Sequence, residues 1–189
     1  MIIQRGDDQM EQYALRKSLH AEDIRGLREK MGLSQGDFSR FLSVSKRTVE
    51  RWETSKEPIT GAIVTLFEIL QRESDWEKEF RIPEKRLKLR LIYMYESMVC
   101  TIIDVDEIER KVNIKNYIKN PMFRAFGVNT EPTYEDYEEF IESRCFPKTR
   151  DKMKIELKKI GVPFYDPILI IEKTEGRMAD DRFWIHIER

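Results

Sequence analysis

The stretch from Ser34 to Glu53, SQGDFSRFLSVSKRTVERWE, constrains the fold most, because its pattern predicts two short helices joined by a tight turn. Ser34 and Ser45 each precede a helical pattern, and their hydroxyls can cap the first turn by accepting a backbone N–H. Apolar residues recur at helical spacing and are expected to meet in one core: Phe38, Phe41, Leu42, Val49 and Trp52. A short helix with a basic outer face, braced by another helix, has the geometry that enters a DNA major groove.

These residues resemble the helix-turn-helix of the XRE family of Cro-type repressors. The matching positions are Leu33, Ser34, Gln35, Phe38, Leu42, Val44, Ser45, Thr48, Val49, Trp52, Glu53, Pro58 and Leu66. The resemblance implies an all-α DNA-binding domain over residues 19–72 that binds a palindromic operator as a homodimer. The family usually has alanine at Ser39 and glycine at Ser43 and Ser55, so both of these last serines are expected to need a positive φ angle.

The resemblance also implies which side chains contact DNA. Family geometry puts Lys46, Arg47 and Arg51 over base edges, where an arginine fork can bridge O6 and N7 of guanine. A second set of candidates is placed for the phosphate backbone or the start of the helix: Gln35, Ser45, Thr48 and Lys56. The alternative left open is that Lys46 and Arg51 are solvated and pair with Glu50 or Glu53.

Composition excludes several classes of protein. The chain has 34 basic and 35 acidic residues, so DNA binding must come from a local basic face and not from overall charge. No apolar run is long enough to span a membrane and the first residues lack the apolar stretch of a signal peptide, so we expect a cytoplasmic protein. Cys100 and Cys145 are expected to be reduced, buried thiols, with a disulfide between them as the alternative.

No catalytic or metal-binding pattern is visible. The two histidines, His20 and His186, belong to no cluster with zinc spacing. A glycine-rich phosphate loop and a GxSxG elbow are also missing. The acidic cluster of residues 135–139 lies along one predicted helix and is interpreted as a solvated face. We therefore expect no enzyme activity, no catalytic residue, no metal and no cofactor.

We assign the chain to the α+β class and expect four segments along it. Residues 1–18 form an N-terminal arm or helix, and residues 19–72 form the helix-turn-helix domain. Residues 73–86 are charge-dense and predict a helical junction that ends before Pro83. Residues 87–189 predict a small α+β domain that binds a partner.

The second domain is expected to combine a sheet with covering helices. Three β-rich stretches predict an antiparallel meander of three strands: residues 86–95, 99–105 and 110–117. Amphipathic helices are expected to cover one face: one capped by Thr133, a basic one over residues 148–160 ended by Gly161, and one capped by Asp166. Residues 183–187 are interpreted as a last strand or an extended tail.

Residues 87–160 are similar to the small N-terminal subdomain of HipA-type toxin kinases. The similarity lies in the meander, an aromatic helix, and a segment whose matching residues are Arg144, Phe146, Pro147, Thr149 and Arg150. Neither an ATP-binding loop nor a catalytic aspartate motif accompanies it. It implies a HipB- or HipS-like antitoxin that represses its own gene and whose second domain binds a HipA-like kinase or another protein.

The candidate partner-binding residues are basic or polar and flank a proline: Arg144, Lys148, Thr149 and Arg150. Such a cluster can hold a phosphate, a carboxylate or an acidic helix of a partner. The alternative left open for the cluster is a structural turn in which Arg144 caps a helix C terminus. The alternative for the protein is a one-component transcriptional regulator whose second domain senses a small ligand.

Overall fold

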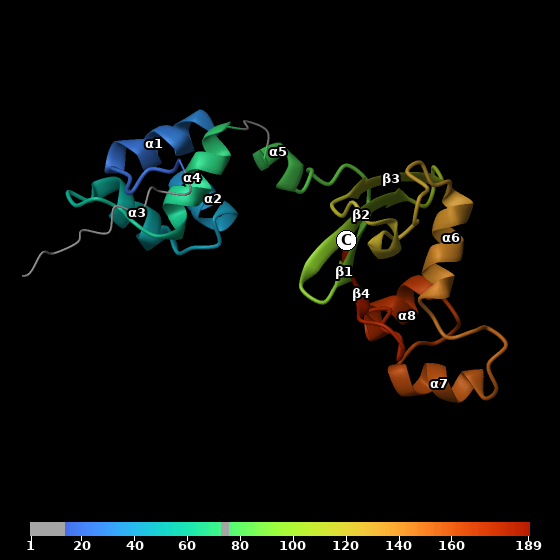
Figure 1. Cartoon of the computed structure of the whole chain (residues 1–189). Helices are drawn as coiled ribbons and strands as arrows, with labels where there is room; N and C mark the ends of the chain where they lie inside the picture. Colours follow the sequence, from blue (N-terminus) through green and yellow to red (C-terminus); the bar gives the residue numbers. More distant parts are fainter. Residues whose placement is uncertain (1–13, 73–75) are drawn as a thin grey trace, which may run out of the picture. The chain divides into compact units, whose positions relative to one another are not determined.

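The computed structural model describes residues 14–72 and 76–189 (Figure 1). Most of the expected N-terminal arm therefore lies outside the described residues. The chain divides into two compact units, the first ending at Arg81 and the second beginning at Ile82. The first unit is helical and the second contains a four-stranded antiparallel sheet, so the α+β class is confirmed. In the described part of the chain, no helix combines the length and apolarity that crossing a membrane requires.

The described part of the first unit consists of short helices: α1 (Ala21–Lys30), α2 (Gln35–Phe41), α3 (Lys46–Thr54), α4 (Ala62–Arg72) and α5 (Trp76–Phe80). The two expected caps are confirmed, because Ser34 Oγ accepts the N–H of Asp37 and Ser45 Oγ accepts the N–H of Thr48. Gly32, with φ of 68°, follows the C-cap of α1 and takes the left-handed conformation that lets the chain leave the helix. Local sequence signals therefore set these boundaries.

The three serines that replace the usual family residues behave differently from one another. Ser43 has φ of 55°, as expected, in the turn between α2 and α3. The same expectation is wrong for Ser55, whose φ is −65°, because its extended backbone ends α3 and its hydroxyl accepts the N–H of Glu57 at 3.1 Å. Buried Ser39 donates to the carbonyl of Gly36 at 2.8 Å, so the buried hydroxyl is satisfied.

The core of the first unit lies among α1 to α4. Phe38 and Val49 are completely buried, as expected, together with Leu19 and Ile24. Trp52 packs against this cluster, as expected for a core residue, but it lies at its edge and is only partly buried.

The second unit is built on a sheet with strand order β3-β2-β1-β4, in which all neighbours are antiparallel. The strands are β1 (Leu89–Tyr95), β2 (Met98–Asp106), β3 (Lys111–Asn116) and β4 (Phe183–Glu188). The predicted meander is confirmed, and the C-terminal segment adds a fourth strand to it. Strand β1 starts later than residue 86, because its partner strand ends where the Asp106 carboxylate begins a turn by accepting the N–H groups of Ile108 and Glu109.

Helices α6 (Tyr134–Ser143) and α8 (Pro167–Thr174) contact the sheet, and α7 (Met153–Ile160) packs on α8 (Figure 1). A 3-10 turn, η1 (Pro121–Phe123), precedes them. The expected capping residues are confirmed at Thr133 and Asp166, which accept backbone N–H groups, and at Gly161, with φ of 71°. Helix α7 is shorter than residues 148–160, because Lys152 has a left-handed backbone with φ of 61° that cannot continue a helix.

One face of the sheet forms the core of the second unit with these helices. Leu91, Ile103 and Ile185 from three strands meet Tyr137 of α6 and Ile171 of α8, and all five are essentially inaccessible to solvent. The same core encloses the two cysteines, which are free thiols, so the disulfide alternative is excluded.

Candidate nucleic-acid interface

Helix α3 carries the basic residues expected to contact DNA. Lys46, Arg47 and Arg51 are exposed, while Val49 on the opposite side is completely buried. Arg47 and Arg51 are one turn apart and therefore project on the same side of the helix. Lys56, in the loop after α3, is exposed as well. The sequence-predicted cations are thus displayed together on one short helix and the loop that follows it.

The ion pairs around α3 leave the two arginines available. Lys46 Nζ lies 3.4 Å from Glu50 Oε1, an exposed i,i+4 pair. Within the described ranges, no carboxylate lies in ion-pair distance of Arg47 or Arg51. The pairing alternative therefore applies to Lys46 but not to Arg51, and an exposed pair of this kind contributes only about 0.3–0.5 kcal/mol.

The start of α3 is fixed by two hydroxyl groups. Ser45 Oγ accepts the N–H of Thr48 at 3.1 Å, and the two hydroxyl oxygens lie 2.8 Å apart. A cap of this type stabilises a helix by about 1 kcal/mol. The first turn of α3 is thereby held in place beside the residues expected to contact DNA.

Glu53 joins α3 to the two helices before it. Its carboxylate is buried and accepts from Arg28 Nε of α1 at 2.6 Å and from Gln35 Nε2 of α2 at 2.8 Å. Arg25 Nη2 donates to the backbone carbonyl of Glu53 at 2.8 Å. Burial opposes ionisation of Glu53, but the hydrogen bonds from Arg28 and Gln35 outweigh it and lower the pKa of its carboxyl group. The orientation of α3 therefore depends on this ionised carboxylate.

This network includes a role that sequence reasoning missed. Gln35 was expected to contact a phosphate, and the structure shows that one of its amide N–H groups instead binds Glu53. Its second amide N–H is left for a phosphate, so holding Glu53 and contacting DNA are compatible. Arg28 gave no signal of its role, because it lies in the first helix among apolar residues, far from Glu53 in sequence.

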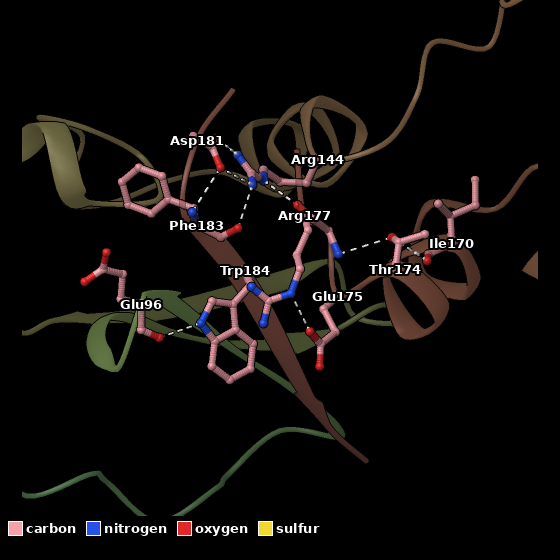
Figure 2. Close-up of polar contacts among 10 residues, drawn as sticks. Glu96, Arg144, Ile170, Thr174, Glu175, Arg177, Asp181, Phe183 and Trp184 are labelled. Atoms are coloured by element: carbon pink, nitrogen blue, oxygen red, sulfur yellow. Dashed lines mark hydrogen bonds and ion pairs between the residues drawn. The ribbon is translucent and has the colours of Figure 1, made fainter. Parts of the chain in front are cut away.

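The candidate partner-binding residues differ in exposure, since Arg144 is buried and the other three are exposed. Arg144, the C-cap residue of α6, is only 8% exposed. Its guanidinium donates to Asp181 Oδ2 at 2.6 Å from Nη1, and to Asp181 Oδ1 and the Phe183 carbonyl at 3.1 Å from Nη2 (Figure 2). Nε donates to the Gly176 carbonyl at 3.0 Å. The hydrogen bond from Arg144 also lowers the pKa of Asp181.

This arrangement gives Arg144 a place inside the fold. It connects the end of α6 to the segment that enters β4, so its role is structural, as in the turn alternative, but its guanidinium donates to Asp181, Gly176 and Phe183 and not to the last carbonyls of α6. With four hydrogen bonds inside the protein, the guanidinium has little capacity left for a partner. We therefore leave Arg144 out of the proposed partner surface.

Lys148, Thr149 and Arg150 are exposed in the loop between α6 and α7. Lys148 pairs with Glu142, and the Arg150 guanidinium lies 5.8 Å from the centre of the Phe146 ring. These three residues remain accessible to a partner.

Metal binding and thiol chemistry have little support among the described residues. No group of histidine, cysteine and carboxylate side chains in residues 14–72 and 76–189 is arranged to hold a metal ion. Burial raises the pKa of the Cys145 thiol to about 12, so the thiol is a poor nucleophile at neutral pH.

Comparison with known proteins adds one similarity. No protein family model matches the chain. The chain is 36% identical over 55 residues to Antitoxin HigA-2 of Vibrio cholerae serotype O1. The aligned stretch covers 29% of this chain and 53% of that antitoxin, so the chain spans about half the length of the curated relative it matches.

Proposed function

We propose that this chain is a sequence-specific DNA-binding transcriptional regulator of the antitoxin type, which represses its own gene and binds a partner protein through its second unit. The observation that carries the proposal is the pair Arg47 and Arg51, which are exposed and make no ion pair with any described carboxylate, on a capped helix whose orientation is fixed by buried Glu53. The similarity to an antitoxin supports the same role.

The proposed DNA contacts follow from this geometry. Lys46, Arg47 and Arg51 contact base edges in the major groove, because the outer side of α3 presents these three side chains together. The surrounding contacts to phosphates are made by Gln35, Ser45, Thr48 and Lys56. Phosphate contacts fix the register of the protein on DNA, and the base contacts supply the sequence preference.

A homodimer on a palindromic operator completes the proposal. An apolar groove of about 530 Å³ lies among α2, α4 and α5, with Ile69 48% exposed and Phe80 61% exposed along it. The Phe41 and Phe80 rings pack at a centroid distance of 6.4 Å beside it. Two copies that bury this groove against each other would present two α3 helices to the two half-sites of an operator.

The proposed partner of the second unit is a toxin protein. The resemblance of residues 87–160 to a subdomain of HipA-type kinases favours a kinase of that class. The accessible residues that support binding are Lys148, Thr149 and Arg150.

Selection of bound sites from random duplex DNA tests the proposal. We expect the selection to enrich a palindrome with a guanine in each half-site. Two copies of the protein should bind each duplex that carries it. Lys173→Ala, which removes one exposed positive charge from α8, should select the same sequence, whereas Arg47→Ala should lose the preference at one base pair of each half-site. Enrichment of no sequence by the parent protein would refute the DNA-reading role.

A further inference from the structure

A groove beside α7 lies in the second unit, outside the residues proposed to contact DNA. It has a volume of about 460 Å³ and is lined by Lys154, Leu157, Lys158, Gly161, Val162 and Pro163. Leu157 and Val162 are buried and form an apolar floor. Gly161 leaves open space where a side chain would project, since no atom lies within 4 Å of an added Cβ. The groove is therefore accessible to a ligand that brings apolar surface.

The charges along the groove are unbalanced. Residues 148–160 contain six basic and two acidic side chains. Glu156 pairs with Lys159 at 2.9 Å, whereas Lys154 and Lys158 make no ion pair with any described carboxylate. These two lysines are one helical turn apart, so their ammonium groups lie on the same side of α7. They form a pair of positive charges beside the apolar floor.

Two exposed apolar side chains lie close in sequence to the groove residues. Ile155 of α7 is 51% exposed and Phe164, just after Pro163, is 60% exposed. A ligand that satisfied only the lysines would leave this apolar surface in water. A phosphate backbone offers charge without apolar groups, whereas an amphipathic helix offers both.

We propose that this groove binds an acidic amphipathic helix of the partner protein. Two carboxylates spaced one turn apart pair with Lys154 and Lys158, and an apolar side chain between them covers Leu157 and Val162. The inference rests on the proposed function only in taking the second unit to bind a protein. It places the contact on α7, C-terminal to the loop that carries Lys148, Thr149 and Arg150.

The test uses the full chain and a defined probe. The probe is a capped, alanine-based helical peptide with two glutamates one turn apart and a leucine between them, and its control has glutamine in place of both glutamates. In ¹⁵N–¹H spectra of the protein, the glutamate peptide should shift the amide signals of Lys154, Lys158 and Gly161. The glutamine peptide should bind at least about tenfold more weakly, which corresponds to about 1.4 kcal/mol.

Variants separate the groove from other basic surfaces. Lys154→Glu with Lys158→Glu should weaken the glutamate peptide at least about tenfold, and the milder Lys154→Gln with Lys158→Gln should weaken it less. Lys119→Glu with Lys173→Glu makes the same charge change at exposed sites elsewhere and should leave affinity unchanged. All four positions are exposed, so these variants should keep the parental spectrum outside the changed sites.

Three results would overturn the inference. The first is equal affinity for the glutamate and glutamine peptides, and the second is a peptide that shifts α3 signals in place of α7 signals. The third is a mixed-sequence DNA duplex that shifts the α7 signals and displaces the peptide, which would make α7 a nucleic-acid surface. Operator binding is measured on the same samples, so that failure of the groove with operator binding intact would leave the DNA-reading role standing.

Discussion

Replacement of Arg144 by alanine should destabilise the second unit while leaving the first unit intact. The change removes four hydrogen bonds and, among the described residues, leaves the Asp181 carboxylate with only the N–H of Phe183 as a partner at 2.9 Å. It also leaves the carbonyls of Gly176 and Phe183 without this donor. Loss of one member of a buried ion pair costs about 3–5 kcal/mol. Because the Asp181 side chain is 28% exposed and can be rehydrated, we expect the lower end, about 3 kcal/mol.

The assay must report on the second unit alone, because a chain with two compact units need not unfold in one step. Native-state hydrogen exchange of the β1 and β4 amides meets this need, since these strands pair with each other next to the Arg144 contact. Arg150→Ala, an exposed arginine in the following loop, is the matched control and should change the free energy of opening by less than about 0.5 kcal/mol.

The effect should also depend on pH. The pKa of Asp181 is lower in the folded protein, so its stabilising contribution is present above the unfolded value of about 3.9 and is lost as the pH falls through the folded value. The difference in free energy of opening between the parent and Arg144→Ala should therefore be fully present near pH 7. It should shrink in acid as the pH falls below the unfolded pKa of Asp181 and through its folded pKa. Unchanged exchange of β4 amides in Arg144→Ala at pH 7 would refute the structural role of the guanidinium.

Three further predictions concern buried groups. Glu53→Gln should destabilise the first unit by about 2–4 kcal/mol by leaving Arg28 without its carboxylate, as urea unfolding would show, and the parent's advantage should fade as the pH drops through the lowered pKa of Glu53. Trp52→Ala should cost about 1–3 kcal/mol, less than a fully enclosed indole would, and its loss of DNA binding should track its loss of folding in parallel melting and gel-shift measurements. Cys145 should resist a thiol reagent at pH 8 in the folded protein and react at once in urea, because burial raises its pKa to about 12; rapid reaction in the folded state would contradict its enclosure.

Features set by neighbouring residues could be predicted from the sequence. The capping serines Ser34 and Ser45 and the helix-ending Gly161 act through groups a few residues away, so their patterns indicate helix ends directly. The strands of the meander were predictable for the same reason, because alternation along one strand reports which face is buried.

Features set by distant contacts could not be predicted. Arg144 resembles an exposed basic residue in sequence, and its role depends on Asp181, 37 residues away. Glu53 and Arg28 are 25 residues apart, and the sequence around neither residue indicates that their side chains meet. The φ angle of Ser55 follows from the loop that it enters and not from the residue type that relatives carry at that position.

The affinity of α3 variants for the selected operator, measured across a range of salt concentrations, shows whether α3 reads the DNA sequence. Arg47→Ala and Arg51→Ala should each lose about 1–3 kcal/mol of specific binding and relax the preference at one base pair. Lys56→Ala should weaken binding to all sequences alike and reduce the salt slope by about one, because a phosphate contact releases counterions without reading sequence. If all three variants bind the same operator with parental affinity and parental salt dependence, α3 is not the DNA-reading helix.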